Sequence, residues 1–397
     1  MNIIFNKRLL LVFILTLLCG MVSDAANNLI TQQITIKLDK AGTLPNKIGS
    51  TRKYQLTNLK IIGEINGTDL RMIREMAGRD YKGNETSGKL SILDLSEAKI
   101  VKGGDYYYYN NKGSNKLYYT SEYHLGDCAF INCAELTSIT IPSSVTEIDE
   151  EVFAGCSGLT SLPISSSVTK IGKRAFEGCT GLTSVTIPSS VTSIVGAFNG
   201  CTGLTSVTIP SSVTEIGADA FKGCTGLTSV TIPSSVTSID QFAFYGCSGL
   251  TSVNIPSSVT KISYQAFRGC SGLTSVTIPS SVKYLGGDVF NYCSRLTSVY
   301  VSWQSPISGA GFYRIDKSKC ILYVPQGTYQ NYLLADEWGD FENIVEYDPT
   351  GINSVTNSAE TKEVSRYSMD GQLLSAPTKG VNIVKYSDGS VKKVTVK

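Results

Sequence analysis

The sequence predicts a β-rich solenoid of 23-residue repeats, with a cap at each end and a small all-β tail domain. Cysteines recur through the 397-residue chain at one fixed spacing, except that the step from Cys179 is shorter by one position; they are Cys133, Cys156, Cys179, Cys201, Cys224, Cys247, Cys270 and Cys293. The phrase Gly-Leu-Thr-Ser-Val-Thr-Ile-Pro-Ser-Ser-Val-Thr-x-Ile recurs between them, followed by Ala-Phe-x-Gly. A fixed period of about 20–30 residues is typical of coils that stack on their neighbours.

Each repeat predicts two short strands and a turn. In one unit, Leu204 to Ile209 alternates apolar and polar residues, so Ser206 and Thr208 are expected to point outward. Pro210 ends this strand, and a second alternating stretch, Ser212 to Ile216, predicts another. Ala220-Phe221 is expected to pack inward from a short turn of helix. The one shortened unit has lost its missing residue from the variable connector, so its strand register should survive.

The cysteines are expected to be buried free thiols. Residues one coil apart have Cα atoms about 4.8 Å apart, and their Cβ bonds run parallel, whereas a disulfide needs Cβ atoms that point at each other. Such thiols pack as small hydrophobic groups. The exceptions to consider are Cys128 with Cys133, whose pairing stays open, and Cys320.

The flanking segments divide the chain into further parts. Residues 1–25 predict a signal peptide, with Lys7-Arg8 before an apolar run and a small-residue cleavage site before Ala26. The other expected parts are an N-terminal cap region at 26–124, the solenoid at 125–301, a C-terminal cap at 302–347, a linker at 348–362 and the β tail at 363–397. Within the N-terminal cap, residues 66–78 predict a helix with a Thr/Asp start. Pro163 predicts an irregular rung.

The repeat phrase resembles the BspA-like leucine-rich repeat family over about residues 125–345. The resemblance implies an exported protein, secreted or associated with the outer membrane, that adheres to host proteins or to other bacteria. The tail, with Asp370-Gly371 and Asp388-Gly389 turns, is similar to the sorting β-domain of type IX secretion cargo. Whether such a tail is cleaved or anchored is left open.

Two surfaces are candidates for ligand binding. The outward strand residues form two files of mostly hydroxyl side chains, which either bind a partner or are simply soluble residues suited to strands; they are Ser184, Thr186, Ser206, Thr208, Ser229, Thr231, Ser252, Asn254 and, at the last repeat, Tyr300. The second candidate is a Tyr-rich loop with Tyr106, Tyr107, Tyr108 and Tyr109. These tyrosines either recognise a partner, since tyrosine offers contact area at low entropic cost, or pack on the first coil as part of the cap.

Nothing in the sequence predicts catalysis, a cofactor or a metal site. His124 is the only histidine and is expected to be structural or exposed, which argues against Ser-His-Asp catalysis and a His-based zinc site. The net charge of +2, with 17% charged residues, offers no basic stripe for nucleic acid. No membrane span is expected in the mature protein. We therefore expect a non-catalytic surface protein that binds another protein. The alternatives are a glycan-binding module, which would need aromatic platforms, and a passive structural protein. The ligand and the oligomeric state are not predicted.

Overall fold

The computed structural model describes residues 29–110, 115–349, 363–368, 372–386 and 391–396. The signal peptide and nearly all of the linker expected from the sequence lie outside these residues, as do the two Asp-Gly turns of the tail. The chain divides into two compact units, Met1–Ser167 and Val168–Lys397. Each unit contains stacked coils of the repeat, and the second also contains a small all-β tail.

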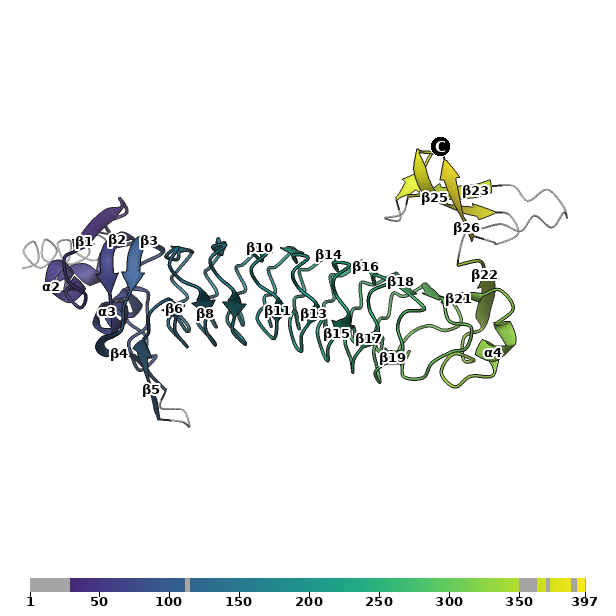
Figure 1. Ribbon diagram of the computed structural model, residues 1–397, viewed down its shortest axis with the longest axis horizontal. Coiled ribbons are helices and arrows are strands. Elements are labelled where there is room, and N and C mark those ends of the chain that lie inside the picture. Colours follow the sequence, from purple (N-terminus) through teal and green to yellow (C-terminus); the bar gives the residue numbers. More distant parts are fainter. Residues whose placement is uncertain (1–28, 111–114, 350–362, 369–371, 387–390, 397) are drawn as a thin grey trace, which may run out of the picture. The chain divides into compact units, whose positions relative to one another are not determined.

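The first unit begins with the N-terminal cap and continues into the first coils (Figure 1). Its elements are β1 (Ile34–Leu38), α2 (Leu44–Ile48), the 3-10 helix η1 (Arg52–Tyr54), β2 (Asn58–Ile65), α3 (Gly67–Met76), β3 (Ile92–Ile100), β4 (Gly103–Asn110), β5 (Lys116–Thr120), β6 (His124–Leu125), β7 (Ser138–Thr140) and β8 (Glu147–Ile148). Strands β1, β2, β3 and β7 form one parallel sheet in that order. The cap thus extends the sheet of the coils and covers its first apolar edge.

Two local predictions for this unit need correction. The helix α3 starts from Asn66, whose side chain accepts a hydrogen bond from the backbone of Thr68, while Asp69 accepts one from the backbone of Asn66. This reciprocal capping explains why the N-cap lies before the Thr/Asp pair. The Tyr-rich segment is not a loop, because Gly103–Asn110 forms strand β4 and pairs with β5 as an antiparallel hairpin. A strand satisfies the backbone groups that a loop would leave open.

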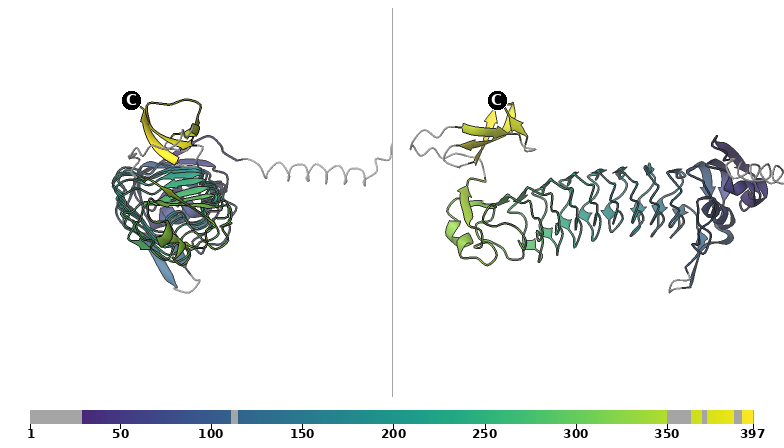
Figure 2. Two further views of the ribbon diagram at one scale, coloured as in Figure 1. Left: turned by 90° about the vertical axis from the view of Figure 1, so that its right-hand side faces the viewer. Right: turned by 180° about the vertical axis from the view of Figure 1, so that it is seen from behind.

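The second unit contains the regular coils, the C-terminal cap and the tail. Its strands in the coils are β9 (Lys170–Ile171), β10 (Ser184–Thr186), β11 (Ser193–Ile194), β12 (Ser206–Thr208), β13 (Glu215–Ile216), β14 (Ser229–Thr231), β15 (Ser238–Ile239), β16 (Ser252–Asn254), β17 (Lys261–Ile262), β18 (Ser275–Ile278), β19 (Tyr284–Leu285) and β20 (Ser298–Val301). Within the coils the first strands (β10, β12, β14, β16, β18 and β20) and the second strands (β9, β11, β13, β15, β17 and β19) lie on different sides. The first strands form one row and the second strands another, as Figure 1 and the rear view of Figure 2 show. The strand pairs within these rows are parallel.

The shortened repeat keeps its register. Ser184 pairs with Ser206 and Ser193 pairs with Glu215, so both of its strands shift together by the one missing position. The deletion is absorbed in the connector, where Gly196 adopts a φ of 58°. The predicted irregular rung is also confirmed, because Pro163 leaves only an isolated bridge between Ser138 and Ser161. The predicted turn of helix at Ala220-Phe221 is wrong, since hydrogen-bonded turns without helix occupy that place.

Two buried ladders hold the coils of the second unit together. Phenylalanines of successive coils stack face to face with ring centroids 5.2 to 5.8 Å apart from Phe176 to Phe290. From Cys201 to Cys293, each repeat cysteine donates its thiol hydrogen to the carbonyl of the phenylalanine one coil earlier, as Cys247 does to Phe221 at 3.1 Å. All ten cysteines from Cys128 to Cys320 are buried, and among the described residues none of them forms a disulfide. The cysteine is therefore a hydrogen-bond donor as well as a core residue, a role that the sequence interpretation missed.

A close approach between coils explains the glycine of the repeated Cys-x-Gly. A Cβ at Gly249 would lie 2.4 Å from the carbonyl oxygen of Thr225 in the preceding coil. No side chain fits at that distance, so the turn requires glycine.

The C-terminal cap and the tail complete the second unit. The cap consists of β21 (Ile321–Pro325), α4 (Tyr329–Leu333) and β22 (Asn343–Tyr347), with β21 and β22 continuing the sheet of β20. Trp338 is 1% exposed and contacts Phe312 edge to face, so it closes the apolar interior at this end. The tail is an antiparallel sheet in the order β24-β23-β25-β26, made of β23 (Glu363–Tyr367), β24 (Leu373–Leu374), β25 (Gly380–Tyr386) and β26 (Val391–Val396).

Within the described residues, no helix has the length and apolar character needed to cross a membrane.

Substituting one central phenylalanine tests the stacked ladder. We expect Phe244→Ala to lower the free energy of unfolding by about 3–5 kcal/mol, because the cavity removes contacts with rings in two neighbouring coils. Phe242→Ala is the matched control, since Phe242 lies two residues away and is only half-buried. Chemical denaturation of both variants measures the difference, and equal losses would contradict the ladder.

The buried thiols predict a loss of stability at alkaline pH. Burial raises the pKa of Cys201, Cys247 and Cys293 to about 12, whereas a thiol in an unfolded chain has a pKa of about 8.5. Between these values the unfolded chain releases protons that the folded chain keeps, so the free energy of unfolding should fall as pH rises above about 8.5. Denaturation curves at pH 7.5 to 9.5 measure this fall.

Alkylation followed by peptide mass spectrometry is the control for this effect. The coil cysteines should react with iodoacetamide only after denaturation, and labelling of Cys247 in the native protein would contradict the burial. In Cys247→Ala the fall with pH should be shallower.

Candidate binding surfaces

The outward residues of the first strands form an exposed surface of hydroxyl and amide groups. In the row of first strands, Ser184 lies beside Ser206 and Ser229 lies beside Ser252. The eight residues on β10, β12, β14 and β16 that the sequence predicts to point outward are all exposed. Their side chains form no hydrogen bond with the part of the chain that the structure describes. Their donors and acceptors are therefore available to a partner.

The ninth residue of this set, Tyr300, has different surroundings. Its ring stacks on Tyr323 with centroids 4.3 Å apart, and Tyr347 meets it edge to face. Burial raises the pKa of the Tyr300 hydroxyl above its usual range. Tyr300 therefore belongs to an aromatic cluster of the C-terminal cap and is only half-exposed.

The four tyrosines of β4 divide between packing and exposure. Tyr107 is 1% exposed and its hydroxyl donates to the carbonyl of Asp127 at 2.7 Å. Tyr106 is half-buried and meets Tyr81 and Tyr119 edge to face. Tyr119 itself is 53% exposed. The hairpin thus attaches to the first coil through Tyr107 and presents other rings to solvent.

Cations accompany the remaining rings of the hairpin. The guanidinium of Arg71 lies 5.2 Å from the ring centroid of Tyr106 and 3.6 Å from that of Tyr81, which precedes the hairpin. Arg74 lies 4.8 Å from the ring centroid of Tyr108. Arg74 is fully buried and donates to the carbonyls of Cys128 and Ala129 at 2.9 Å each. Tyr109 donates to the side chain of Asn115 at 3.1 Å. Most of this cluster therefore serves to join helix α3 and the hairpin to the first coil.

Sequence reasoning missed an aromatic surface on the turns of the last coils. Tyr292 and Tyr313 are 39% and 57% exposed and meet edge to face with centroids 5.4 Å apart. A shallow depression of about 510 Å³ lies here, lined by Gly269, Ser271, Tyr292, Ser294 and Arg314. Tyrosine, guanidinium and hydroxyl groups together suit a polar, flat ligand.

The repeat pattern itself carried the signal for this surface. Tyr292 and Arg314 have φ of 64° and 67°, where the two preceding coils have Gly246 and Gly269 at 71° and 75°. A non-glycine residue in the left-handed region costs about 1–2 kcal/mol. Two bulky residues at a glycine position of the repeat therefore mark this end of the solenoid as different from its middle.

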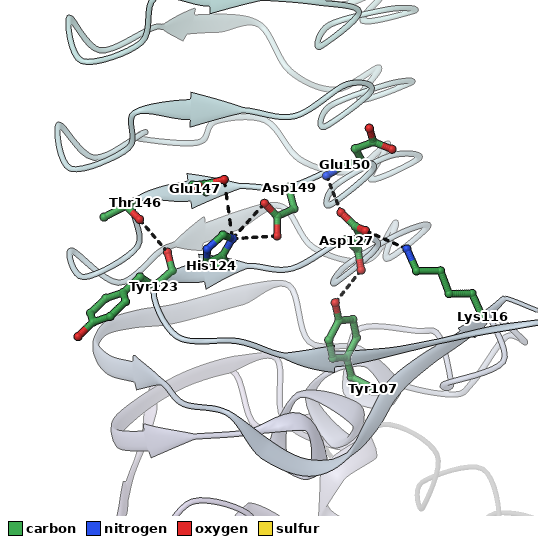
Figure 3. Close-up of polar contacts among 9 residues, drawn as sticks. All are labelled: Tyr107, Lys116, Tyr123, His124, Asp127, Thr146, Glu147, Asp149 and Glu150. Atoms are coloured by element: carbon green, nitrogen blue, oxygen red, sulfur yellow. Dashed lines mark hydrogen bonds and ion pairs between the residues drawn. The ribbon is translucent and has the colours of Figure 1, made fainter.

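The structure also brings together three ionisable side chains of the first coils (Figure 3). Nδ1 of His124 lies 3.3 and 3.2 Å from the two carboxylate oxygens of Asp149 and 3.9 Å from a carboxylate oxygen of Glu147. Burial raises the pKa of the Asp149 carboxyl, and the nearby His124 opposes that rise. His124 and Glu147 face each other because β6 and β8 pair in parallel with these residues in register.

Comparison with known proteins identifies the family. Residues 102–196 and 195–317, more than half of the chain, match the model of the BspA type leucine-rich repeat region. The chain belongs to the BspA-type leucine-rich repeat family. Proteins of this family are typically surface-exposed in bacteria, and their repeats are protein-binding modules. The resemblance of the repeats is thereby confirmed, whereas no comparison identifies the tail as a sorting domain.

Several solved structures are similar to parts of this BspA-type chain. A leucine-rich repeat protein from Bacteroides ovatus is 26% identical, with 61% of this chain and 59% of that chain covered and a TM-score of 0.48. A leucine-rich repeat protein from T. pallidum is 34% identical over 37% of this chain and 69% of that one, with a TM-score of 0.36. This chain thus spans less than two thirds of the Bacteroides ovatus protein. No curated protein matches it.

Removing one hydroxyl tests how the hairpin is attached. Tyr107→Phe should lower the free energy of unfolding by about 1 kcal/mol, because the carbonyl of Asp127 loses its buried donor. Tyr119→Phe, on the same hairpin but exposed, should leave stability unchanged. Denaturant titration compares the two, and an unaffected Tyr107→Phe would show that the hydroxyl does not secure the hairpin.

Proposed function

We propose that this chain is an exported protein of a bacterial surface whose leucine-rich repeats bind another protein and catalyse no reaction. The observation that carries this proposal is the exposed surface of the first strands, whose hydroxyl and amide groups have no partner within the described part of the chain. Such groups lie in a regular parallel array, which suits hydrogen bonding to an extended polypeptide. Host matrix proteins and proteins of other bacteria are the partners that family membership favours.

The reactive groups of the chain support a non-catalytic role. Its thiols from Cys128 to Cys320 are buried, and burial raises the pKa of those that include Cys201 and Cys247, so these are poor nucleophiles near neutral pH. The ring of His124 faces carboxylates, and within the described residues no hydroxyl or thiol is hydrogen-bonded to it. Export rests on the signal peptide expected at residues 1–25 and on the tail similar to a sorting domain.

A glycan is the second candidate ligand, and a different surface favours it. Tyr292 and Tyr313 offer the exposed aromatic rings that the first strands lack, and Arg314 lines the depression together with Tyr292. Sugars stack their apolar faces on such rings, while the guanidinium and hydroxyl groups can bind polar substituents. A ligand bound there would not need the hydroxyl surface.

Lysine substitutions on the first strands, compared with the same substitutions at turns, test the protein-binding proposal. Thr208→Lys combined with Thr231→Lys should lower binding to protein partners on an array of matrix and bacterial surface proteins at least tenfold, because lysine blocks the surface of hydroxyl groups. The matched control is Thr202→Lys combined with Thr225→Lys, which makes the same changes in the same two coils at exposed turn positions. The control should bind as the wild type does.

The outcomes separate the hypotheses. Binding only to glycans, abolished by Tyr292→Ala, would replace the protein with a carbohydrate ligand. Binding by both lysine variants at the level of the wild type would show that the first strands are not the contact surface. Absence of any binding by the wild type would favour a passive structural role.

A further inference from the structure

The three ionisable side chains of the first coils have an arrangement suited to a metal ion. One atom from each of His124, Glu147 and Asp149 can be chosen so that all lie within 4.8 Å of one another. We propose that these residues form a three-ligand site for a divalent transition-metal ion of the zinc class. This inference does not depend on the proposed function.

The ligand types and distances fit such an ion. Zinc binds imidazole nitrogen and carboxylate oxygen at about 2.0–2.2 Å, so two ligands of a tetrahedral ion lie about 3.3 Å apart. The separation of 3.2 Å between Nδ1 of His124 and Oδ2 of Asp149 already matches this edge. Glu147 is 3.9 Å from the same nitrogen and needs a shift of its flexible side chain only. One neutral imidazole and two carboxylates also match the charge of a dication.

The backbone places the ligands in a fixed arrangement. His124 and Glu147 are partners in the pairing of β6 with β8, and Asp149 follows two residues later, on the same side of the chain. The amide of Asp149 donates to the carbonyl of Leu125 at 2.9 Å, and that of Thr146 donates to the carbonyl of Tyr123 at 2.8 Å. The site is thus fixed at both ends by hydrogen bonds between adjacent coils. Figure 3 shows two further contacts beside it, from Thr146 to Tyr123 and from Glu150 to Asp127.

Residues next to the site hold the segment that carries Glu147 and Asp149 in place. Asp127 accepts from the backbone of Glu150 at 3.0 Å and lies 3.5 Å from the ammonium group of Lys116. The hydroxyl of Tyr107 donates to the carbonyl of Asp127. The ligand side chains keep 19% to 33% of their surface exposed, so an ion can enter and retain water in its open coordination position.

Metal titration of the full chain, without a polyhistidine tag, tests the site. Isothermal titration at pH 7.5 should show one Zn²⁺ ion bound, and His124→Gln and Asp149→Asn should each weaken binding at least tenfold. Glu150→Gln is the matched control, because it removes an exposed neighbouring carboxylate that is not a ligand. It should bind Zn²⁺ as the wild type does.

Cobalt separates this site from the ten thiols. The Co²⁺ form should show weak visible bands and no intense thiolate-to-metal band near the ultraviolet, because its ligands are nitrogen and oxygen. His124→Gln keeps every cysteine, and thermal unfolding verifies that it folds; if it does not, Asp149→Asn provides the same test. Absence of binding by the wild type, unchanged binding in the folded variant, or a thiolate band would each overturn the proposal.

Discussion

The structure depends on the unstaggered parallel pairing of each coil with the next. From Ser229 with Ser252 to Thr277 with Tyr300, paired residues of the first strands are one full repeat apart. Because neither strand slips, identical side chains stack on themselves, and the Phe, Cys and Ser/Thr ladders follow from one geometric rule. The shortened repeat obeys it as well, since its missing residue is taken from a connector and both of its strands shift together.

This rule separates the residues of the repeat that build the core from the residues that can differ from one repeat to the next. Phe and Cys cannot vary freely, because each ring contacts the next and each thiol serves a carbonyl in the coil before it. Connectors and turns face solvent and tolerate substitution. The exposed rings of Tyr292 and Tyr313 lie at such positions. The side chains of His124 and Asp149 lie on and directly after short strands of the first coils. Differences between repeats can therefore accumulate outside the core ladders without disturbing the stacking of the coils.

The sequence predicted the coils well because their contacts repeat with the period of the chain, which identifies the inward residues without knowledge of their partners. It failed where contacts link residues that no pattern connects. The strand character of β4 depends on pairing with β5, and the burial of Tyr107 depends on a carbonyl outside the hairpin. The cluster around His124 was accessible in principle. Glu147 lies one repeat period after it, so the register rule places the two side by side.

Distances between spin labels test the register most directly. Nitroxide labels on cysteines introduced in place of Thr231 and Asn254, and of Thr231 and Thr277, sample one and two coil spacings on the same file of outward residues. The native thiols are buried, so they leave the introduced cysteines free to react selectively. Unstaggered stacking predicts backbone separations of about 5 Å and about 10 Å. The first pair should therefore show strong spin coupling and the second a much weaker one, because dipolar coupling falls with the cube of the distance. Weak coupling between labels one repeat apart, or no regular increase in distance between the two pairs, would contradict the register on which the fold and its surfaces depend.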